Sequence, residues 1–192
     1  LDNLVHYNWH WRWQWGGGEL ANNGIHALDV VRWGLGVDVP RTVSYVGGRY
    51  HYDDDQETPD TGVVTYDFGD VGCTWEGSSC HPRRGEKKPF AAFYGTEGEM
   101  HIVGAGYEIY DIQGKKVDSG SGSGGEQGHI ENFLECIKTG QAPNSEIEIG
   151  QASTLLCHLG NISERAGRTL HLDPATGEGQ GDAEAEKLWK GE

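Results

Sequence analysis

The segment GGGELANNGIHALDVVRWGLG, residues 16–36, decides the fold of this chain, because it predicts a helix. Besides the apolar residues that would pack, this helix carries polar residues suited to a site. Between Glu19 and Leu35 the apolar residues recur at helical spacing, and the closing glycines with Pro40 beyond them favour a stop. At steps of four, three and four, one stripe of this helix carries an amide, an imidazole, a carboxylate and an indole: Asn22, His26, Asp29 and Trp33. We therefore expect the helix to face a site as well as a core.

The stripe is chemically coherent around its histidine. Asp29 can accept a hydrogen bond from one imidazole nitrogen of His26 and fix its tautomer, which leaves the other nitrogen free to act as an acid or a base. Gly24 has no side chain, so we expect it to keep this face open to a ligand. The same pair could equally be a hydrogen-bonded histidine that only bridges the helix and the core, and the residues alone leave both interpretations open.

The segment that precedes the helix, WHWRWQW (9–15), alternates tryptophan with polar residues. In an extended chain every indole of this segment would lie on one face. Flat indole rings suit the faces of sugar rings, and their N–H groups need partners. The pattern predicts either an aromatic strand packed into the core or one wall of a sugar site.

Several short β-like runs follow from residue 41 to residue 117, separated by turn residues and without helices between them, which indicates an antiparallel meander. A Gly/Ser-rich joint at 119–128 leads to two further helices, expected at about 128–139 and 146–166. These elements predict an α+β domain: an open, largely antiparallel mixed sheet with helices packed on one face. We place this domain at 1–172, followed at 173–192 by an acidic tail with at most a short helix.

Composition narrows the class of partner. A formal net charge of −15 disfavours nucleic acids and anionic membrane surfaces, and no apolar run approaches the roughly 18 residues that span a bilayer. Four cysteines without a CxxC pair are typical of free thiols in a reducing, cytoplasmic compartment, although a Cys73–Cys80 disulfide is an alternative. No GxGxxG loop and no paired zinc ligands occur, so we assign no cofactor-binding and no metal-binding residues to this chain.

Two charged loops leave alternatives open. HYDDDQETPD (51–60) gathers carboxylates that could hold a hard cation, but it lacks the spacing of a calcium loop, and a solvated acidic loop is favoured. HPRRGEKK (81–88) could grip a phosphate or carboxylate, but a solvated hairpin is favoured.

The segment 16–36 resembles the start of the C-terminal domain of Gfo/Idh/MocA oxidoreductases, the relatives of glucose–fructose oxidoreductase and inositol dehydrogenase, and most closely their bacterial branch with Trp-rich sites. Later stretches resemble that domain in the same order, so that the likeness covers nearly the whole chain: FYGTEGEM (93–100), GYEIYDIQGKKV (106–117), HIENFLECIKTG (129–140) and GDAEAEKLW (181–189). The resemblance implies the dihydrodipicolinate-reductase-like open sheet of that domain. It also implies an N-terminal Rossmann domain, absent from this chain, that holds most of the NAD or NADP.

The resemblance implies roles for particular residues. A histidine of this helix acts on the substrate hydroxyl as acid and base in the family, and its position matches His26. The family commonly has a carboxylate one turn earlier, where this chain has Asn22, which cannot take a proton but can bind a hydroxyl. The implied substrate contacts are ring stacking by Trp11, Trp13 and Trp15 and hydrogen bonds from Asn22 and Asp29, the latter to a hydroxyl or to His26.

In function, the resemblance implies the substrate-binding and oligomerisation domain of an NAD(P)-dependent sugar or polyol oxidoreductase that transfers hydride at a carbinol carbon. We expect homo-oligomers through the open sheet face, and no catalysis by this chain alone. The alternatives are an NAD-dependent glycoside hydrolase of the same superfamily and a non-catalytic carbohydrate-binding or scaffold module.

Overall fold

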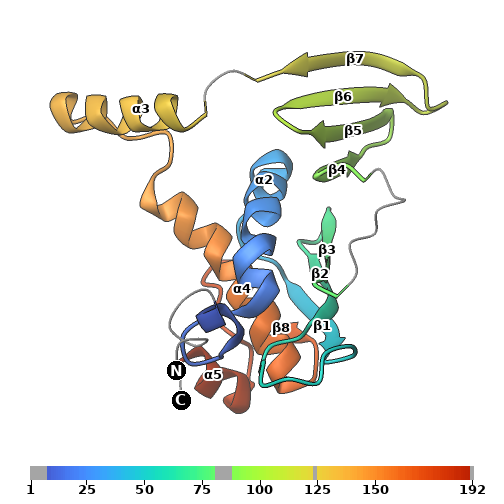
Figure 1. Ribbon diagram of the computed structural model, residues 1–192, viewed down its shortest axis with the longest axis vertical. Coiled ribbons are helices and arrows are strands. Elements are labelled where there is room, and N and C mark those ends of the chain that lie inside the picture. Colours follow the sequence, from blue (N-terminus) through green and yellow to red (C-terminus); the bar gives the residue numbers. More distant parts are fainter. Residues whose placement is uncertain (1–7, 81–87, 123–124, 191–192) are drawn as a thin grey trace. The chain divides into compact units, whose positions relative to one another are not determined.

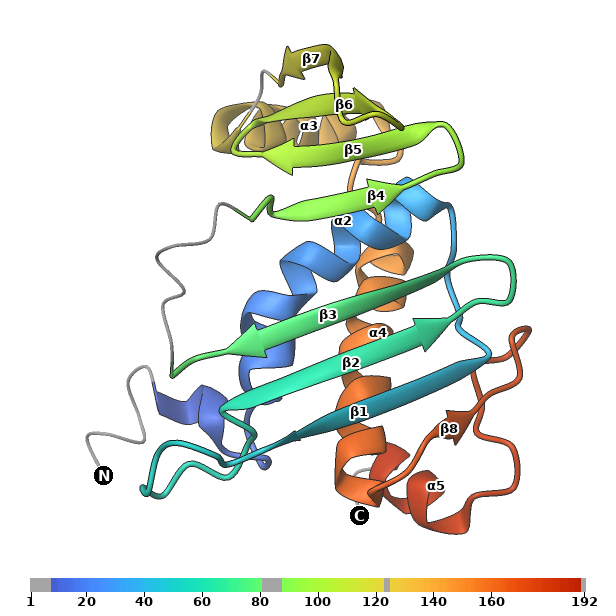
Figure 2. The same ribbon diagram turned by 90° about the vertical axis from the view of Figure 1, so that its right-hand side faces the viewer.

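A computed structural model of the protein describes residues 8–80, 88–122 and 125–190 (Figures 1 and 2). The chain divides into two compact units, one made of residues 1–84 with 152–192 and the other of residues 85–151. Each unit contains one four-stranded sheet, and every strand pairing within both sheets is antiparallel. The predicted α+β class is confirmed, with the strands shared between two sheets.

The sheet of the first unit has the order β3-β2-β1-β8. Its strands are β1 (Thr42–Gly48), β2 (Thr61–Asp67), β3 (Gly72–Ser78) and the short β8 (Leu170–His171). From residue 62 to the end of β2, buried and exposed residues alternate, as expected for a strand that is covered on one face only. Figure 2 shows α2 and α4 on that covered face.

Helix α4 (Ile147–Ala166) supplies four of the buried apolar residues in the core that lies under this sheet. Its residues Leu156 and Leu159 are buried with Val64 and Tyr66 of β2, and the Tyr66 hydroxyl donates a hydrogen bond to the carbonyl of Leu156 at 2.9 Å. Gly160 allows close approach, because a Cβ there would lie 2.5 Å from the Leu20 side chain. The helix predicted at 146–166 is therefore present.

The helix predicted over Glu19–Leu35 is also present, and it contains an irregularity that the sequence pattern did not predict. Its first part is a π-helical segment, η2 (Leu20–Gly24), which continues directly into α2 (Ile25–Leu35). Gly36 ends the helix in the left-handed conformation, with φ of 66°, and its N–H bonds to the last turn. Short π segments occur frequently at functional sites.

The second unit has a meander sheet of order β4-β5-β6-β7, followed by a helix. The elements are β4 (Ala91–Tyr94), β5 (Gly98–Val103), β6 (Gly106–Asp111), β7 (Lys116–Ser121) and α3 (Glu126–Thr139). The expectation of a flexible joint from residue 119 was wrong in its first residues, because β7 continues to Ser121. Gly120 lies opposite Tyr107 and leaves room for its ring, since a Cβ there would lie 2.6 Å from the ring.

The acidic C-terminal segment forms a short helix, α5 (Ala183–Trp189), and Ala185 and Leu188 pack against the core. Asp182 caps this helix by accepting hydrogen bonds from the N–H groups of Glu184 and Ala185. Arg168 donates two hydrogen bonds to the same carboxylate, at 2.8 and 2.5 Å. The domain boundary at residue 172 remains a prediction.

Replacing Asp182 with alanine should speed amide hydrogen exchange across residues 183–189, since it removes the cap that starts α5. The control is Glu184→Ala, which removes one Arg168 contact but keeps the cap. The Arg168 guanidinium, together with the Ala185 N–H, lowers the pKa of Asp182 to about 2. The cap should therefore stay fully effective above about pH 4 and be lost as the pH falls toward 2. Equal exchange in both variants would contradict this role.

The cysteines agree with the free-thiol prediction. All four are free, so the Cys73–Cys80 disulfide does not form in this structure. Burial raises the pKa of Cys73 to about 11 and that of Cys157 to about 12. No helix within the described ranges is long and apolar enough to cross a membrane. The basic loop at 81–88 lies, except for Lys88, outside the described residues.

Candidate functional site

The Trp-rich segment does not form the strand that its alternation predicts. Residues Asn8–Trp11 form a 3-10 helix, η1, and the chain then turns, with the N–H groups of Trp15 and Gly16 bonded to the carbonyl of Arg12 at 3.0 and 2.8 Å. The extended-chain interpretation was wrong, because alternation places side chains on one face only where the backbone is extended. Here the backbone groups are satisfied within local turns instead.

The predicted tryptophans have different surroundings. Trp11 is partly buried, and its carbonyl accepts a hydrogen bond from the N–H of Glu57 at 3.0 Å. Trp13 lies under the guanidinium of Arg165, which is 5.3 Å from the ring centroid, a cation–π contact. Trp15 is exposed. Of the three, only Trp11 is among the residues that line a pocket.

The acidic loop opposite Trp11 is anchored from below by Asp60. This carboxylate is buried and accepts hydrogen bonds from the N–H groups of Tyr50, His51 and Tyr52, at 3.2, 3.0 and 3.2 Å. Burial by itself raises the pKa of Asp60, but the backbone donors outweigh that effect, and the pKa lies below its ordinary value. Asp60 therefore remains ionised at neutral pH and holds the loop in one conformation.

Two arginines pair with three of the four remaining carboxylates of this loop. Arg49 pairs with Asp54 at 2.5 Å. Arg12 pairs with both Asp55 and Glu57. The favoured interpretation, a solvated acidic loop, is therefore incomplete, since three of the loop's carboxylates form ion pairs with arginine side chains. In the sequence, the one sign of these ion pairs was Arg12, which lies among the tryptophans of WHWRWQW.

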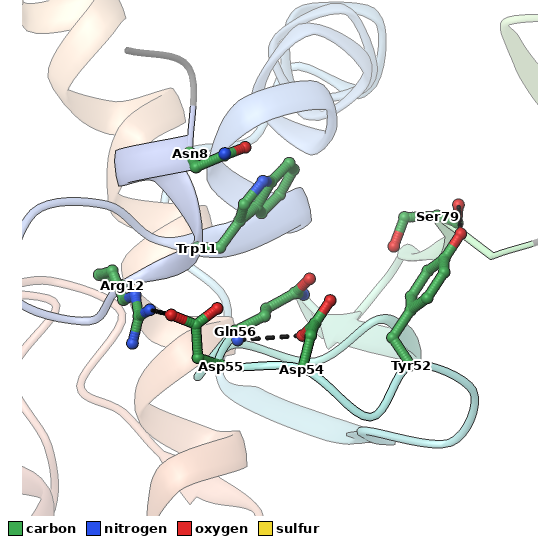
Figure 3. A pocket seen from close by; sticks show the side chains of 8 residues that line it. All are labelled: Asn8, Trp11, Arg12, Tyr52, Asp54, Asp55, Gln56 and Ser79. Carbon is green, nitrogen blue, oxygen red and sulfur yellow. Dashed lines mark hydrogen bonds and ion pairs between the residues drawn. The ribbon is translucent and has the colours of Figure 1, made fainter. Parts of the chain in front are cut away.

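A pocket of about 340 Å³ lies between η1 and this loop (Figure 3). In Figure 3 the ring of Trp11 faces the side chains of Asp54, Asp55 and Gln56 across the opening, and Tyr52 lies at one end, beside Ser79. The lining residues are Asn8, Trp11, Arg12, Tyr52, Asp54, Asp55, Gln56 and Ser79. Trp11 is the only one of the six predicted site residues among them. Aromatic walls with several hydrogen-bonding groups are typical of sugar sites.

On the stripe of the predicted helix, Asp29 contacts helix α4. Asp29 accepts a hydrogen bond from the Ser153 hydroxyl at 2.5 Å, and that hydroxyl accepts one from Arg32 Nε at 2.8 Å. Asp29 is therefore oriented by Ser153. His26 is exposed, and within the described part of the chain it forms no hydrogen bond with Asp29. The tautomer-fixing pair remains a prediction, while Asn22 is partly buried on the π segment.

The glycines around the helix serve packing. A Cβ at Gly16 would lie 2.6 Å from the His10 carbonyl oxygen, and Gly18, with φ of 64°, has Thr58 at 2.6 Å. Gly24 is buried, and a Cβ there would lie 3.1 Å from the ring of Trp75. The expectation that Gly24 opens the helix to a ligand was wrong, because a protein side chain fills that space. From the sequence alone, a glycine that leaves room for a ligand cannot be distinguished from one that leaves room for a neighbouring side chain.

No metal-binding cluster of three or more histidine, cysteine, aspartate or glutamate side chains occurs within the ranges that the structure describes. The acidic loop thus offers ion pairs and hydrogen-bond acceptors. The candidate functional residues are those that line the pocket at Trp11 and, outside that lining, the exposed imidazole of His26, all in the first unit.

Comparison with known proteins identifies the family to which this chain is related. Residues 2–101, just over half of the chain, match the family described as the GFO/IDH/MocA C-terminal domain. A search of curated proteins found no match to the sequence.

Solved structures with the same fold include three oxidoreductases. The aldose-aldose oxidoreductase of Caulobacter crescentus, complexed with glycerol, is 18% identical with a TM-score of 0.61, over 86% of this chain and 51% of that one. The WlbA dehydrogenase of Bordetella pertussis, in complex with NADH and UDP-GlcNAcA, is 16% identical with a TM-score of 0.58, over 90% and 50%. An oxidoreductase of Agrobacterium radiobacter, in complex with NAD+, L-tartaric acid and magnesium, is 17% identical with a TM-score of 0.59, over 80% and 49%. The chain spans about half the length of these proteins, and at such identities the likeness shows the fold.

Proposed function

This chain belongs to the Gfo/Idh/MocA family, and from that membership we propose that it is the substrate-binding and oligomerisation domain of an NAD(P)-dependent sugar or polyol oxidoreductase. The observation that carries the proposal is the exposed imidazole of His26, on a helix that begins beside the Trp11 segment. Two structural neighbours, named as an aldose-aldose oxidoreductase and as a dehydrogenase in complex with a sugar nucleotide, support a sugar-related substrate.

The proposed chemistry of this chain is proton transfer. The nicotinamide cofactor would supply the acceptor or donor of the hydride at a carbinol carbon. His26 takes the proton from the substrate hydroxyl during oxidation and returns it during reduction. Asn22, which cannot carry a proton, holds a hydroxyl by hydrogen bonding, and Asp29 supports the helix face through Ser153.

The glycines that precede η2 do not offer a cradle for the cofactor. A dinucleotide loop needs glycines with free space for the pyrophosphate, but the glycines that open this helix already contact protein atoms of His10, Asn161 and Thr58. The cofactor would therefore be held mainly by a nucleotide-binding domain outside this chain.

The test is product analysis with the enzyme that contains both halves. Incubation with NAD or NADP and a panel of sugars and polyols should change the absorbance of the reduced nicotinamide in proportion to the oxidised sugar formed. A new reducing sugar without net change of the cofactor would instead support the glycoside hydrolase. Saturable sugar binding by a protein that never turns over cofactor would support the binding module.

Oligomerisation through the helix-free face of the first sheet is the second part of the proposal. Val46 and Val63 lie directly opposite each other on β1 and β2, and they are 71% and 40% exposed. An apolar pair on an uncovered sheet face suits an interface around a two-fold axis.

Sedimentation of the chain should accordingly give a mass above the 21.0 kDa of one copy, and Val63→Lys should shift it toward the monomer. His158→Lys, an exposed change on α4 away from this face, is the control. A monomer at every concentration would contradict the proposal.

A further inference from the structure

We propose that the pocket between η1 and the acidic loop binds the ring of a sugar that carries no negative charge, with amino sugars favoured, and that it excludes uronates and sugar phosphates. This inference rests on the proposed function and deepens it, since it names the class of sugar. It concerns binding by this chain and needs no cofactor.

The size and walls of the pocket suit one sugar ring. Its volume of about 340 Å³ falls at the small end of ligand pockets, which run from roughly 300 to 1,000 Å³. The indole of Trp11 faces the opening and Tyr52 stands at its end, so that the C–H face of a ring can stack on an aromatic surface (Figure 3). Opposite the indole are groups that bind hydroxyls, from Asp54, Asp55 and Gln56.

The charge of the lining opposes anions. Arg12 is the one cationic side chain among the lining residues, and it is paired with both Asp55 and Glu57. Asp54 keeps its charge, because the hydrogen bond from Arg49 lowers its pKa below the ordinary value. Among the lining residues that the structure describes, an anionic sugar would therefore meet carboxylates and a cation that is already paired, whereas an ammonium group would meet acceptors.

The loop that carries these carboxylates is held in place before any ligand arrives. Asp60 binds three successive N–H groups at its base, and the Gln56 side chain donates a hydrogen bond to the carbonyl of Thr58 at 2.8 Å. Arg49 donates a hydrogen bond to Asp54 and so restrains this carboxylate within the loop. Groups fixed in this way cannot easily turn away from a mismatched ligand, so the charge of the pocket translates into selectivity.

The experiment titrates the chain with D-glucose, D-glucosamine, D-glucuronate and glucose 6-phosphate, followed by tryptophan fluorescence and saturation-transfer NMR. We expect glucosamine to bind about fivefold more tightly than glucose and the two anions about fivefold more weakly, the size of one exposed ion pair. Trp11→Ala should weaken all binding about tenfold.

Asp55→Asn tests the origin of the selectivity, since it removes one of the two partners of Arg12. It should strengthen glucuronate binding and weaken glucosamine binding, each about fivefold. Asp53→Asn is the matched control, because it removes the same charge from the same loop at an exposed residue outside the pocket lining.

Three outcomes would overturn the inference: glucuronate bound as tightly as glucosamine, equal effects of the two asparagine variants, or no sugar binding at all. Failure of the proposed function is distinguishable from these. If the sugars bind in the expected order but the complete enzyme oxidises none, the proposed function fails and the pocket assignment stands. If the enzyme turns over sugars with KM values that Trp11→Ala and Asp55→Asn leave unchanged, the pocket assignment fails alone.

Discussion

Replacing His26 with alanine is expected to lower turnover of the complete enzyme by about 10²- to 10⁴-fold and to leave cofactor affinity unchanged. The imidazole is exposed on the helix that we propose faces the substrate, and no other described histidine lies on that helix. Without it, the substrate hydroxyl has no positioned base and the hydride leaves a carbon whose oxygen still holds its proton. The effect should appear in kcat, since the proton moves in the transition state.

The measurement compares kcat, KM and cofactor dissociation constants of the parent and His26→Ala. His158→Ala is the matched control, because His158 is an exposed histidine on α4. Loss of turnover in the first variant alone supports the assignment. Near-normal rates in His26→Ala would remove His26 from the chemistry and require another acid and base.

Replacing Asp60 with alanine is expected to lower the free energy of unfolding by about 3–5 kcal/mol, the largest effect on stability that we predict. Its carboxylate is buried and accepts hydrogen bonds from three successive N–H groups, which would lose their partner in a place that protein atoms fill. The loop that lines the pocket would lose its anchor at the same time.

The effect should depend on pH in a defined direction. Burial raises the pKa of Asp60, but the backbone donors lower it by more, so the folded value lies below the ordinary one. A depressed pKa means that the stabilisation is fully present above the pKa of the unfolded chain, about 3.9, and is lost as the pH falls through the folded value. The difference between parent and variant should therefore be constant near neutrality and shrink in acid.

Urea denaturation at several pH values measures both predictions. Asp53→Ala, an exposed change in the same loop, should leave the midpoint nearly unchanged. If Asp60→Ala had the stability of the parent, or if the gap between them grew in acid, Asp60 would not be the anchor of the loop.

The sequence predicted most of the local structure because its signals act over a few residues. Turn residues between short β-like runs placed the strands between residues 41 and 117, where β1 to β6 lie, and helical periodicity placed α2, α3 and α4. The stripe with His26 was predicted from the same helical spacing. Each of these rests on the backbone preferences of neighbouring residues, which change little with the rest of the fold.

The alternation of WHWRWQW misled for a physical reason. Alternation describes a strand, but a strand needs a partner for its N–H and C=O groups, and here turns around Arg12 satisfy them locally. Gly24 misled in a related way, since only the tertiary structure shows that Trp75 occupies the space beside it.

By itself, then, the sequence determined the α+β class, the helix with His26 and the resemblance to a family that the match over residues 2–101 confirms. The tertiary structure alone decided which charges meet: Arg12 and Asp55 lie 43 positions apart in the chain, and Ser153 and Asp29 lie 124 apart. Pairs so distant leave no periodic trace, because their contact depends on how whole elements pack. The pocket between η1 and the loop arises from that packing.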